Sequence, residues 1–146
     1  MLGTIEIRWH VIAAHNIPYV AQTTFISNFK DLHEKAEKAI YKSKAVFFNI
    51  MAPCPRGWRY PAEELMKICV LAVETCFWPL FEIEDGKWKL TYKPNKKLPI
   101  EEFLKSQGRF KHLFKKGNEM WIREIQNEVD RRWDELLIRC GKGGTV

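Results

Sequence analysis

The sequence contains no long apolar run, no Cys-x-x-Cys pair, no internal repeat and no low-complexity segment. A membrane-spanning helix needs about 20 consecutive apolar residues, so no membrane partner is expected. Residues 1–20 carry charged and histidine side chains within their apolar portion, which is untypical of a signal peptide. We therefore expect a cytoplasmic protein whose four cysteines form neither a disulfide framework nor a self-contained zinc or redox motif.

The composition is that of a globular protein, with 146 residues, 46% hydrophobic and 29% charged, which is enough for one domain with a core. The net charge is +6, but the basic residues are dispersed and most have an acidic neighbour. The densest basic runs, residues 93–97 and 111–116, lack the aromatic and glycine pattern of an RNA-binding sheet. A dock for another subunit or an acidic protein fits this charge better than nucleic acid does.

Apolar periodicity over residues 17–52 predicts a strand, a helix and a second strand. Residues 17–23 form the first strand, residues 28–40 an amphipathic helix, and residues 45–52 a nearly continuous apolar strand expected to be covered on both faces. Such a βαβ unit has parallel strands and a right-handed crossover. It leaves a sheet edge open, which later strands or another polypeptide must cover. Residues 5–15 are spaced like one helix face, although they also alternate like a strand.

The clearest local signal is Asp85-Gly86, a two-residue hairpin turn. On one face of this hairpin, apolar residues stand opposite each other, in the pairs Phe81–Leu90 and Ile83–Trp88. On the other face, glutamates stand opposite lysines, in the pairs Glu82–Lys89 and Glu84–Lys87. Helices are predicted before it, from Pro61 to just before Pro79, and after it, from Pro99 to near Gly108 and over residues 119–139.

Residues 52–58, Ala-Pro-Cys-Pro-Arg-Gly-Trp, follow the second predicted strand. Open α/β sheets bind ligands beyond the carboxyl ends of their parallel strands. Two prolines stiffen the segment around Cys54, and Arg56 nearby favours a thiolate. A lone cysteine is also commonly a small buried hydrophobe, and one thiol cannot hold zinc or a cluster, which need about four ligands. Any ligand partners of Cys54 therefore lie outside this sequence.

The remaining candidates are weaker. Cys69, Cys76 and Cys140 are interpreted as packing residues. Gln22, Thr23 and Thr24 end the first strand on the side of Cys54, where they either satisfy the strand end or contact a ligand. No metal-ligand spacing joins the histidines, which are left without a role: His10, His15, His33 and His112.

Several separate segments, in order, are similar to the beta subunits of 2-oxoacid:ferredoxin oxidoreductases, especially the pyruvate-specific ones. The resemblance runs from about residue 14 to residue 137 and is carried by residues 17–22 (Ile-Pro-Tyr-Val-Ala-Gln), 49–58 (Asn-Ile-Met-Ala-Pro-Cys-Pro-Arg-Gly-Trp), 71–75 (Leu-Ala-Val-Glu-Thr), 77–80 (Phe-Trp-Pro-Leu), 89–94, 103–110 (Phe-Leu-Lys-Ser-Gln-Gly-Arg-Phe) and 129–133.

The resemblance implies an α/β fold: part of a thiamine-diphosphate-binding, Rossmann-like parallel sheet with one βαβ unit, then a β-hairpin and C-terminal helices. Residues 1–92 would be the second half of that domain, and residues 93–146 a helical extension packing on it or on a partner. The family's beta subunit binds thiamine diphosphate with magnesium and a [4Fe–4S] cluster. The resemblance places the fourth cluster ligand at Cys54 and the cofactor crevice near Gln22, Thr23 and Thr24.

In that family the complete enzyme decarboxylates pyruvate oxidatively, forms acetyl-coenzyme A and sends electrons through [4Fe–4S] clusters to ferredoxin, together with alpha, gamma and delta subunits. The family's N-terminal half, with its other cluster cysteines and its Gly-Asp-Gly motif, is absent here. The chain is therefore expected to bind no cofactor and to be inactive alone. The alternatives are a non-catalytic basic interaction module, or a subunit acting on 2-ketoisovalerate or 2-oxoglutarate.

Overall fold

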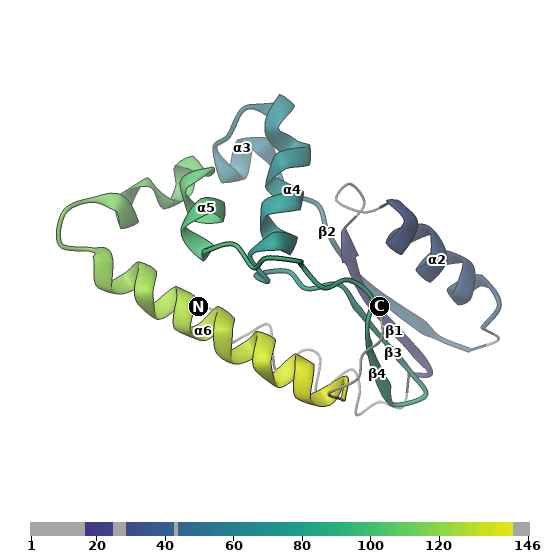
Figure 1. Ribbon diagram of the computed structural model, residues 1–146. Coiled ribbons are helices and arrows are strands. Elements are labelled where there is room, and N and C mark those ends of the chain that lie inside the picture. Colours follow the sequence, from purple (N-terminus) through teal and green to yellow (C-terminus); the bar gives the residue numbers. More distant parts are fainter. Residues whose placement is uncertain (1–16, 25–28, 43, 142–146) are drawn as a thin grey trace.

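A four-stranded sheet organises the chain in the computed structural model, which describes residues 17–24, 29–42 and 44–141 (Figure 1). Strands β1 (Tyr19–Thr24) and β2 (Val46–Met51) are parallel, and helix α2 (Phe29–Ile40) connects them. The predicted βαβ unit is therefore present. The predicted element over residues 5–15 lies outside the described residues, and so do His10 and His15.

The hairpin joins the same sheet. Strands β3 (Phe81–Glu84) and β4 (Lys87–Leu90) pair in the predicted register, and the sheet order is β2-β1-β3-β4. Asp85 and Gly86 have φ of 48° and 79°, the left-handed conformations that a primed turn requires. Because β3 runs antiparallel to β1, the sheet is mixed, and the parallel arrangement expected from the sequence is confined to β1 and β2.

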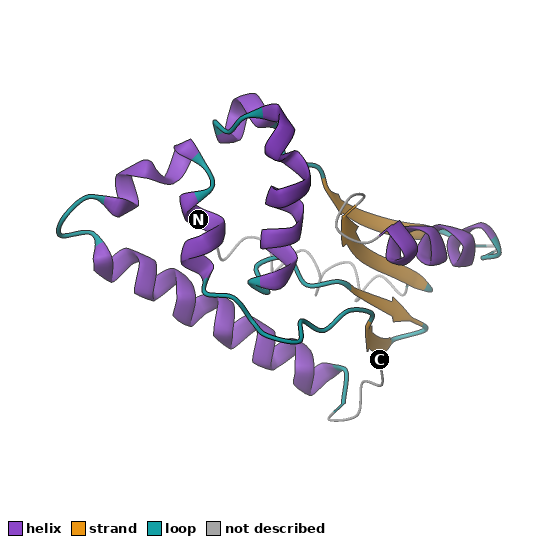
Figure 2. Cartoon of the chain, turned by 45° about the horizontal axis from the view of Figure 1, so that its top comes forward, coloured by secondary structure: helices purple, strands orange, loops and turns teal. Residues whose placement is uncertain are grey.

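The remaining helices lie on the side of the sheet opposite α2 (Figure 2). The helix predicted to begin at Pro61 consists of a 3-10 turn followed by an α-helix. The α-helix ends at Glu74, before the predicted end, because Cys76 adopts a positive φ of 58°. These elements are α3 (Pro55–Trp58), η1 (Ala62–Glu64), α4 (Leu65–Glu74), α5 (Ile100–Lys105), η2 (Gly108–Phe114) and α6 (Glu119–Arg139).

The core forms on this helical side of the sheet. Val20 and Ile83 of the strands belong to the same buried cluster as Ile68 of α4, Phe103 of α5 and Trp133 of α6. Alternation along each strand brings these apolar side chains to one face. The C-terminal helices therefore help to form the same core as the sheet.

The opposite face is less complete. The residues of α2 that are buried against this face include two charged ones, Asp31 and Lys35, which are 4% and 1% exposed. Strand β2 is not covered on both faces as its apolar run predicted, since Val46 is 38% and Ile50 45% exposed. The described residues place α2 on this side with Asp31 and Lys35 turned inward, and they leave β2 partly uncovered. No helix in the described part of the chain is both long and apolar enough to cross a membrane.

Candidate functional site

Cys54 lies where the chain leaves β2. The ends of β1 and β2 are side by side, with Thr24 opposite Met51, and Cys54 caps the N-terminus of the one-turn helix α3. Its thiol is exposed, and the backbone N–H of Gly57 donates a hydrogen bond to its Sγ at 3.4 Å. The thiol is therefore presented to solvent just beyond the carboxyl end of a parallel strand.

The segment around Cys54 is held by its own hydrogen bonds. The backbone N–H of Trp58 donates to the carbonyl of Cys54 at 2.9 Å, and the hydroxyl of Tyr60 donates to the carbonyl of Pro53 at 3.0 Å. Arg59 has a φ of 59°, which is uncommon for a residue other than glycine and ends the turn sharply. These contacts fix the backbone on both sides of the thiol.

The corner between α5 and η2 clamps the same segment from outside. The N–H of Gly108 donates to the carbonyl of Arg59 at 2.9 Å, and a Cβ on Gly108 would lie only 2.6 Å from that oxygen. The guanidinium of Arg109 lies 3.8 Å from the ring centre of Trp58 and 4.6 Å from that of Phe110. Sequence reasoning did not find this clamp, although its residues lie in the segment 103–110 that carries part of the family resemblance.

Buried groups lie behind the exposed thiol. Burial raises the pKa of Tyr60, and the thiols of Cys69 and Cys54 raise it further. Burial also raises the pKa of Cys69, although a hydrogen bond with the side chain of Thr24 acts in the opposite direction. Arg56, which the sequence suggested as a partner for a thiolate, is exposed. The hydroxyl of Tyr60 therefore stays protonated at neutral pH and available to donate its hydrogen bond to Pro53.

The other three cysteines are packed into the protein. Cys69 and Cys76 are 0% and 3% exposed, and burial raises the pKa of the Cys76 thiol to about 12. Burial likewise raises the pKa of Cys140, which is partly exposed. Within the described ranges, no group of three or more His, Cys, Asp or Glu side chains is placed to hold a metal ion. Cys54 is thus the cysteine whose position suits an external ligand.

Two of the three predicted β1 residues are engaged on the core side of the sheet. The amide of Gln22 donates to the carbonyl of Pro79 at 2.9 Å and accepts from the amide of Asn49 at 3.1 Å. The hydroxyl of Thr24 donates to the carbonyl of Met51 at 3.1 Å, beside the segment that carries Cys54. Both side chains are buried and hydrogen-bonded within the chain.

Thr23 points to the opposite face, into a buried polar network under α2. Its hydroxyl donates to the carboxylate of Asp31 at 2.6 Å, and the ammonium of Lys35 donates to that carboxylate at 2.7 Å, to the carbonyl of Gln22 at 2.9 Å and to Thr91 at 2.8 Å. Burial lowers the pKa of Lys35, while Asp31 acts to raise it. The structure therefore does not bring Thr23 to the same side as Cys54.

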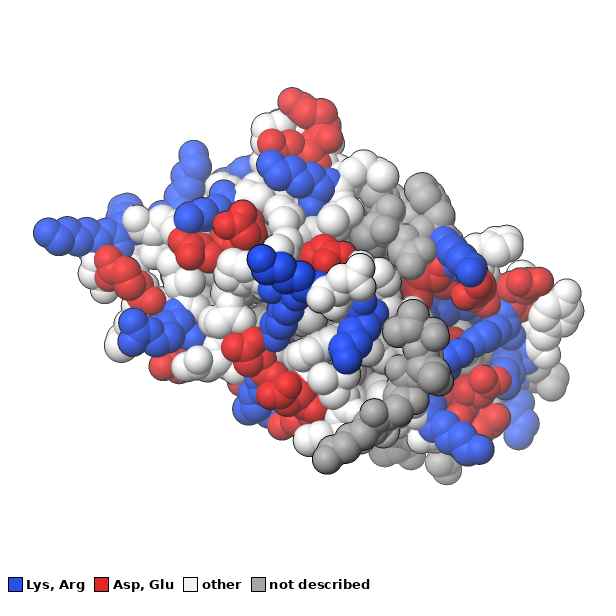
Figure 3. All heavy atoms as spheres, viewed as in Figure 1, with Lys and Arg blue, Asp and Glu red and all other residues white. Residues whose placement is uncertain are grey.

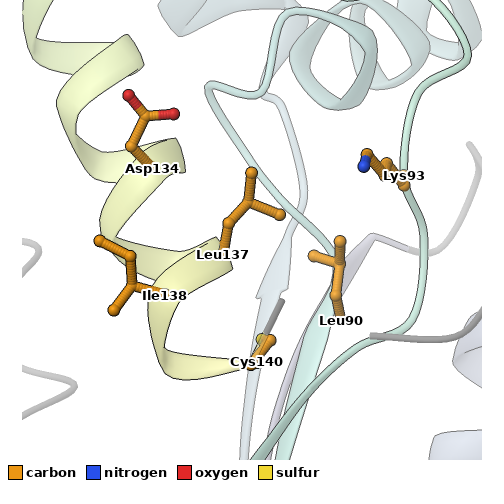
Figure 4. Close-up of a pocket in the computed structure, with 7 residues that line it drawn as sticks. Leu90, Lys93, Asp134, Leu137, Ile138 and Cys140 are labelled. Atoms are coloured by element: carbon orange, nitrogen blue, oxygen red, sulfur yellow. The ribbon is translucent and has the colours of Figure 1, made fainter. Parts of the chain in front are cut away.

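A separate hollow lies between β4 and the C-terminal end of α6, far from α3 in Figure 1. In Figure 4, Leu90 and Leu137 point toward the space between these elements, and Asp134 and Lys93 lie on opposite sides of it. Three aliphatic side chains, one lysine, one aspartate, one cysteine and a glycine line it, and we assign no chemistry to this set: Leu90, Lys93, Asp134, Leu137, Ile138, Cys140 and Gly141.

Charges of both signs are interspersed on the face shown in Figure 3. Ion pairs among the described residues include Lys38 with Glu82 at 2.5 Å and Lys105 with Glu101 at 2.7 Å. The basic side chains visible there do not gather into one continuous patch, in keeping with the dispersed charges of the sequence.

Comparison with known proteins gives close relatives of one kind. No protein-family profile matches the chain. Pyruvate synthase subunit PorB of Thermotoga maritima is 42% identical over 87% of this chain and 39% of its own length, and that of Methanocaldococcus jannaschii is 43% identical over 84% and 39%. Ketoisovalerate oxidoreductase subunit VorB of Pyrococcus furiosus is 43% identical over 86% of this chain and 40% of its own length.

The chain spans about two fifths of the length of these curated relatives. Their names differ in the 2-oxoacid but agree in the kind of subunit. Over most of its length, this chain is homologous to one part of the beta subunits of 2-oxoacid:ferredoxin oxidoreductases. The match is consistent with the C-terminal part of those subunits.

Proposed function

We propose that the chain forms the C-terminal part of a pyruvate:ferredoxin oxidoreductase beta subunit, in which Cys54 supplies the fourth ligand of a [4Fe–4S] cluster. The observation that carries the proposal is an exposed thiol held beyond the end of a parallel strand, in a chain homologous to these subunits. The cluster would accept and pass on single electrons. The remaining ligands, and the Gly-Asp-Gly motif for magnesium and diphosphate, would come from the part of the subunit that this chain does not match.

The chemistry of the Cys54 segment fits one bond to iron. Iron–sulfur clusters are held by thiolates, and hydrogen bonds to sulfur adjust their potential. The N–H of Gly57 already points at Sγ, and the clamp of Gly108 and Arg109 fixes the turn from which the thiol projects. The chain's own contribution is to hold this sulfur in place before the other ligands arrive.

A thiamine diphosphate crevice is supported less directly. The side chains of Gln22 and Thr24 lie at the correct end of β1, but they are buried and hydrogen-bonded to Pro79 and Met51. They would lie beneath the cofactor and support its site. A direct contact between the cofactor and either side chain would require that side chain to give up its hydrogen bond to Pro79 or Met51. Thr23 faces α2 and would hold Asp31 instead.

The proposed substrate is a 2-oxoacid, with pyruvate preferred because the sequence motifs most resemble the pyruvate-specific subunits. The assembled complex would form acetyl-coenzyme A and reduce ferredoxin. Relatives named for pyruvate and for ketoisovalerate are similarly identical to this chain, so overall identity does not separate these substrates. Specificity between them would rest partly on residues outside this chain.

Anaerobic reconstitution tests the role of Cys54. The chain is co-expressed with the portion of the Thermotoga maritima subunit that it does not match, and the purified sample is incubated with iron and sulfide. After reduction with dithionite, we expect a [4Fe–4S] signal in electron paramagnetic resonance that Cys54→Ser abolishes and Cys140→Ser, a matched change at another free cysteine, preserves. A signal that survives Cys54→Ser would favour the non-catalytic interaction module.

A further inference from the structure

Arg109 is a cation without an acidic partner. Its Nε donates a hydrogen bond to the side-chain oxygen of Gln107 at 2.8 Å, and its guanidinium lies against the rings of Trp58 and Phe110. Among the described residues, no Asp or Glu side chain forms an ion pair with it. Partial burial lowers its pKa, but an arginine stays charged at neutral pH. The described part of the chain therefore holds a partly desolvated positive charge without its negative counterpart.

The side chain of Arg109 is held in one orientation. Gln107, its hydrogen-bond acceptor, is 1% exposed and donates to the carbonyl of Phe103 at 2.7 Å. The ring of Trp58 meets the ring of Phe103 edge to face, with centroids 6.2 Å apart. A planar guanidinium stacked on an aromatic ring loses little further freedom when it meets an anion. Its charge is therefore fixed in place in advance, which makes its electrostatic effect strong.

Arg109 is packed on the segment that carries Cys54. Trp58, under the guanidinium, is the last residue of α3, and its N–H donates to the carbonyl of Cys54 at 2.9 Å. Burial is the main cause of the raised pKa of Tyr60, but the Cys54 thiol raises that pKa further and Arg109 lowers it. The hydroxyl of Tyr60 thus lies within electrostatic reach of both groups, which places Arg109 close to the exposed thiol.

The surroundings of Cys54 are basic as a whole. Residues 53–61 and 106–118, which the clamp of Gly108 on Arg59 brings together, contain six Lys and Arg residues and no Asp or Glu. The whole chain has 24 basic and 18 acidic residues, so its other parts carry 18 of each sign. The net charge of +6 therefore arises from these two ranges, where it favours a negatively charged ligand.

We propose that Arg109 supplies a fixed positive charge that stabilises negative charge at the sulfur of Cys54, and that it thereby raises the reduction potential of a cluster bound there. The second half of this inference rests on the proposed function. A cluster held by thiolates is anionic, and reduction adds negative charge to it, so its potential depends on the charges around it. A fixed cation stabilises the reduced form more than the oxidised form. Arg109 acts through space and is not a cluster ligand.

Alkylation of Cys54 tests this charge without any cluster. Cys140→Ser serves as the background, because Cys69 and Cys76 are buried and Cys54 is then the accessible thiol. Rate constants are measured at one pH for iodoacetate, an anion, and iodoacetamide, its neutral counterpart, because their ratio cancels the thiolate fraction and the accessibility of the sulfur. We expect Arg109→Gln to lower the ratio about threefold, the size of one charge acting through solvent. Arg109→Lys should keep the ratio.

Arg139→Gln is the matched control. The guanidinium of Arg139 also lies over a tryptophan, 5.2 Å from the ring centre of Trp88, but at the far end of α6 from α3 (Figure 1). Its removal should leave the alkylation ratio unchanged. Equal losses for Arg109→Gln and Arg139→Gln, or a ratio in Arg109→Lys as low as in Arg109→Gln, would overturn the proposal.

Redox titration of the reconstituted cluster supplies the second measurement. We expect Arg109→Gln to make the midpoint potential more negative by about 59 mV, which is a tenfold change in the equilibrium constant of a one-electron couple. Arg109→Lys should shift it much less. A variant that only loses cluster, with an unchanged potential in what remains, would contradict the proposal. Absence of a Cys54-dependent cluster would refute the proposed function and leave the alkylation result standing, whereas an unchanged alkylation ratio would refute this inference alone.

Discussion

The two faces of β1 are stabilised in different ways. On one face Val20 packs into an apolar core closed by α4, α5 and α6. On the other, Tyr19 and Thr23 meet a network of charges that includes Lys35, and the neighbouring β2 stays partly exposed. The first face is buried under helices of the described part of the chain. The second is held by a few directed polar contacts and leaves Val46 and Ile50 of β2 exposed.

Breaking the buried ion pair should give the largest effect. Lys35→Met leaves the carboxylate of Asp31 without its main cationic partner in a buried site. Removing one member of such a pair destabilises a protein by about 3–5 kcal/mol. We expect a loss of that size in the free energy of unfolding, measured by urea titration.

The paired replacement Asp31→Leu with Lys35→Met removes both charges together. Replacing a whole buried ion pair by apolar residues is often close to neutral. The double variant should therefore be more stable than Lys35→Met alone. Additive losses would show that the α2 face depends on each hydrogen bond separately and not on charge balance.

A cavity in the apolar core tests the face of β1 that is covered by α4, α5 and α6. Trp133 of α6 is only 8% exposed, and Trp133→Ala removes a large side chain from the buried cluster. A loss of about 3 kcal/mol in the free energy of unfolding is expected. Trp121 lies on the same helix and is 54% exposed, so Trp121→Ala should change stability by less than about 0.5 kcal/mol. Similar losses for both would contradict the assignment of the core.

The Cys54 segment is fastened to the closed side, and Gly108 tests that link. Gly108→Ala would bring a Cβ to 2.6 Å from the carbonyl oxygen of Arg59, which forces the clamp to shift. Overpacking of this kind costs about 1–3 kcal/mol. We also expect amide exchange over residues 57–60 to accelerate at least tenfold.

Gly57→Ala is the matched control in the same segment. A Cβ at Gly57 would make only ordinary contact, at 3.7 Å, with the Sγ of Cys54. Its exchange rates and stability should stay close to those of the unmodified chain. Faster exchange in Gly57→Ala than in Gly108→Ala would mean that the α5–η2 corner does not hold the segment.

The sequence was sufficient where a signal is local. The hairpin register follows from Asp85-Gly86 together with complementary pairs such as Glu82 with Lys89, and the structure has that register. The βαβ unit follows from two apolar strands around an amphipathic helix. The family resemblance is confirmed by relatives about 42% identical to the chain.

Non-local contacts escaped sequence reasoning. The carbonyl of Arg59 meets Gly108 only in the folded chain, so periodicity could not reveal the clamp. The sequence predicted only an amphipathic helix over residues 28–40, and the usual rule that charges face water fails for Lys35, which is buried against Asp31 because each charge satisfies the other. The apolar run of β2 suggested cover on both faces, but within the described ranges Val46 and Ile50 remain exposed.

Acid should lower the stability contributed by the α2 face of the sheet, through protonation of Glu82. This is the smallest of the expected effects. Burial would raise the pKa of this carboxyl, but hydrogen bonds from Lys38 and Tyr19 outweigh burial and lower the pKa below its ordinary value of 4.5. A depressed carboxyl pKa stabilises the fold above the ordinary value, and that contribution is lost as the pH falls below 4.5.

Glu82→Gln should therefore lower the free energy of unfolding by about 1 kcal/mol at pH 7 and flatten its decline below the ordinary carboxyl pKa. Lys38 is partly exposed, so solvent screening keeps the effect small. Urea titrations at several pH values measure both quantities, with Glu84→Gln as the control because Glu84 is 44% exposed. An unchanged acid branch in Glu82→Gln would show that the α2 face draws its stability from the Asp31–Lys35 pair and not from Glu82.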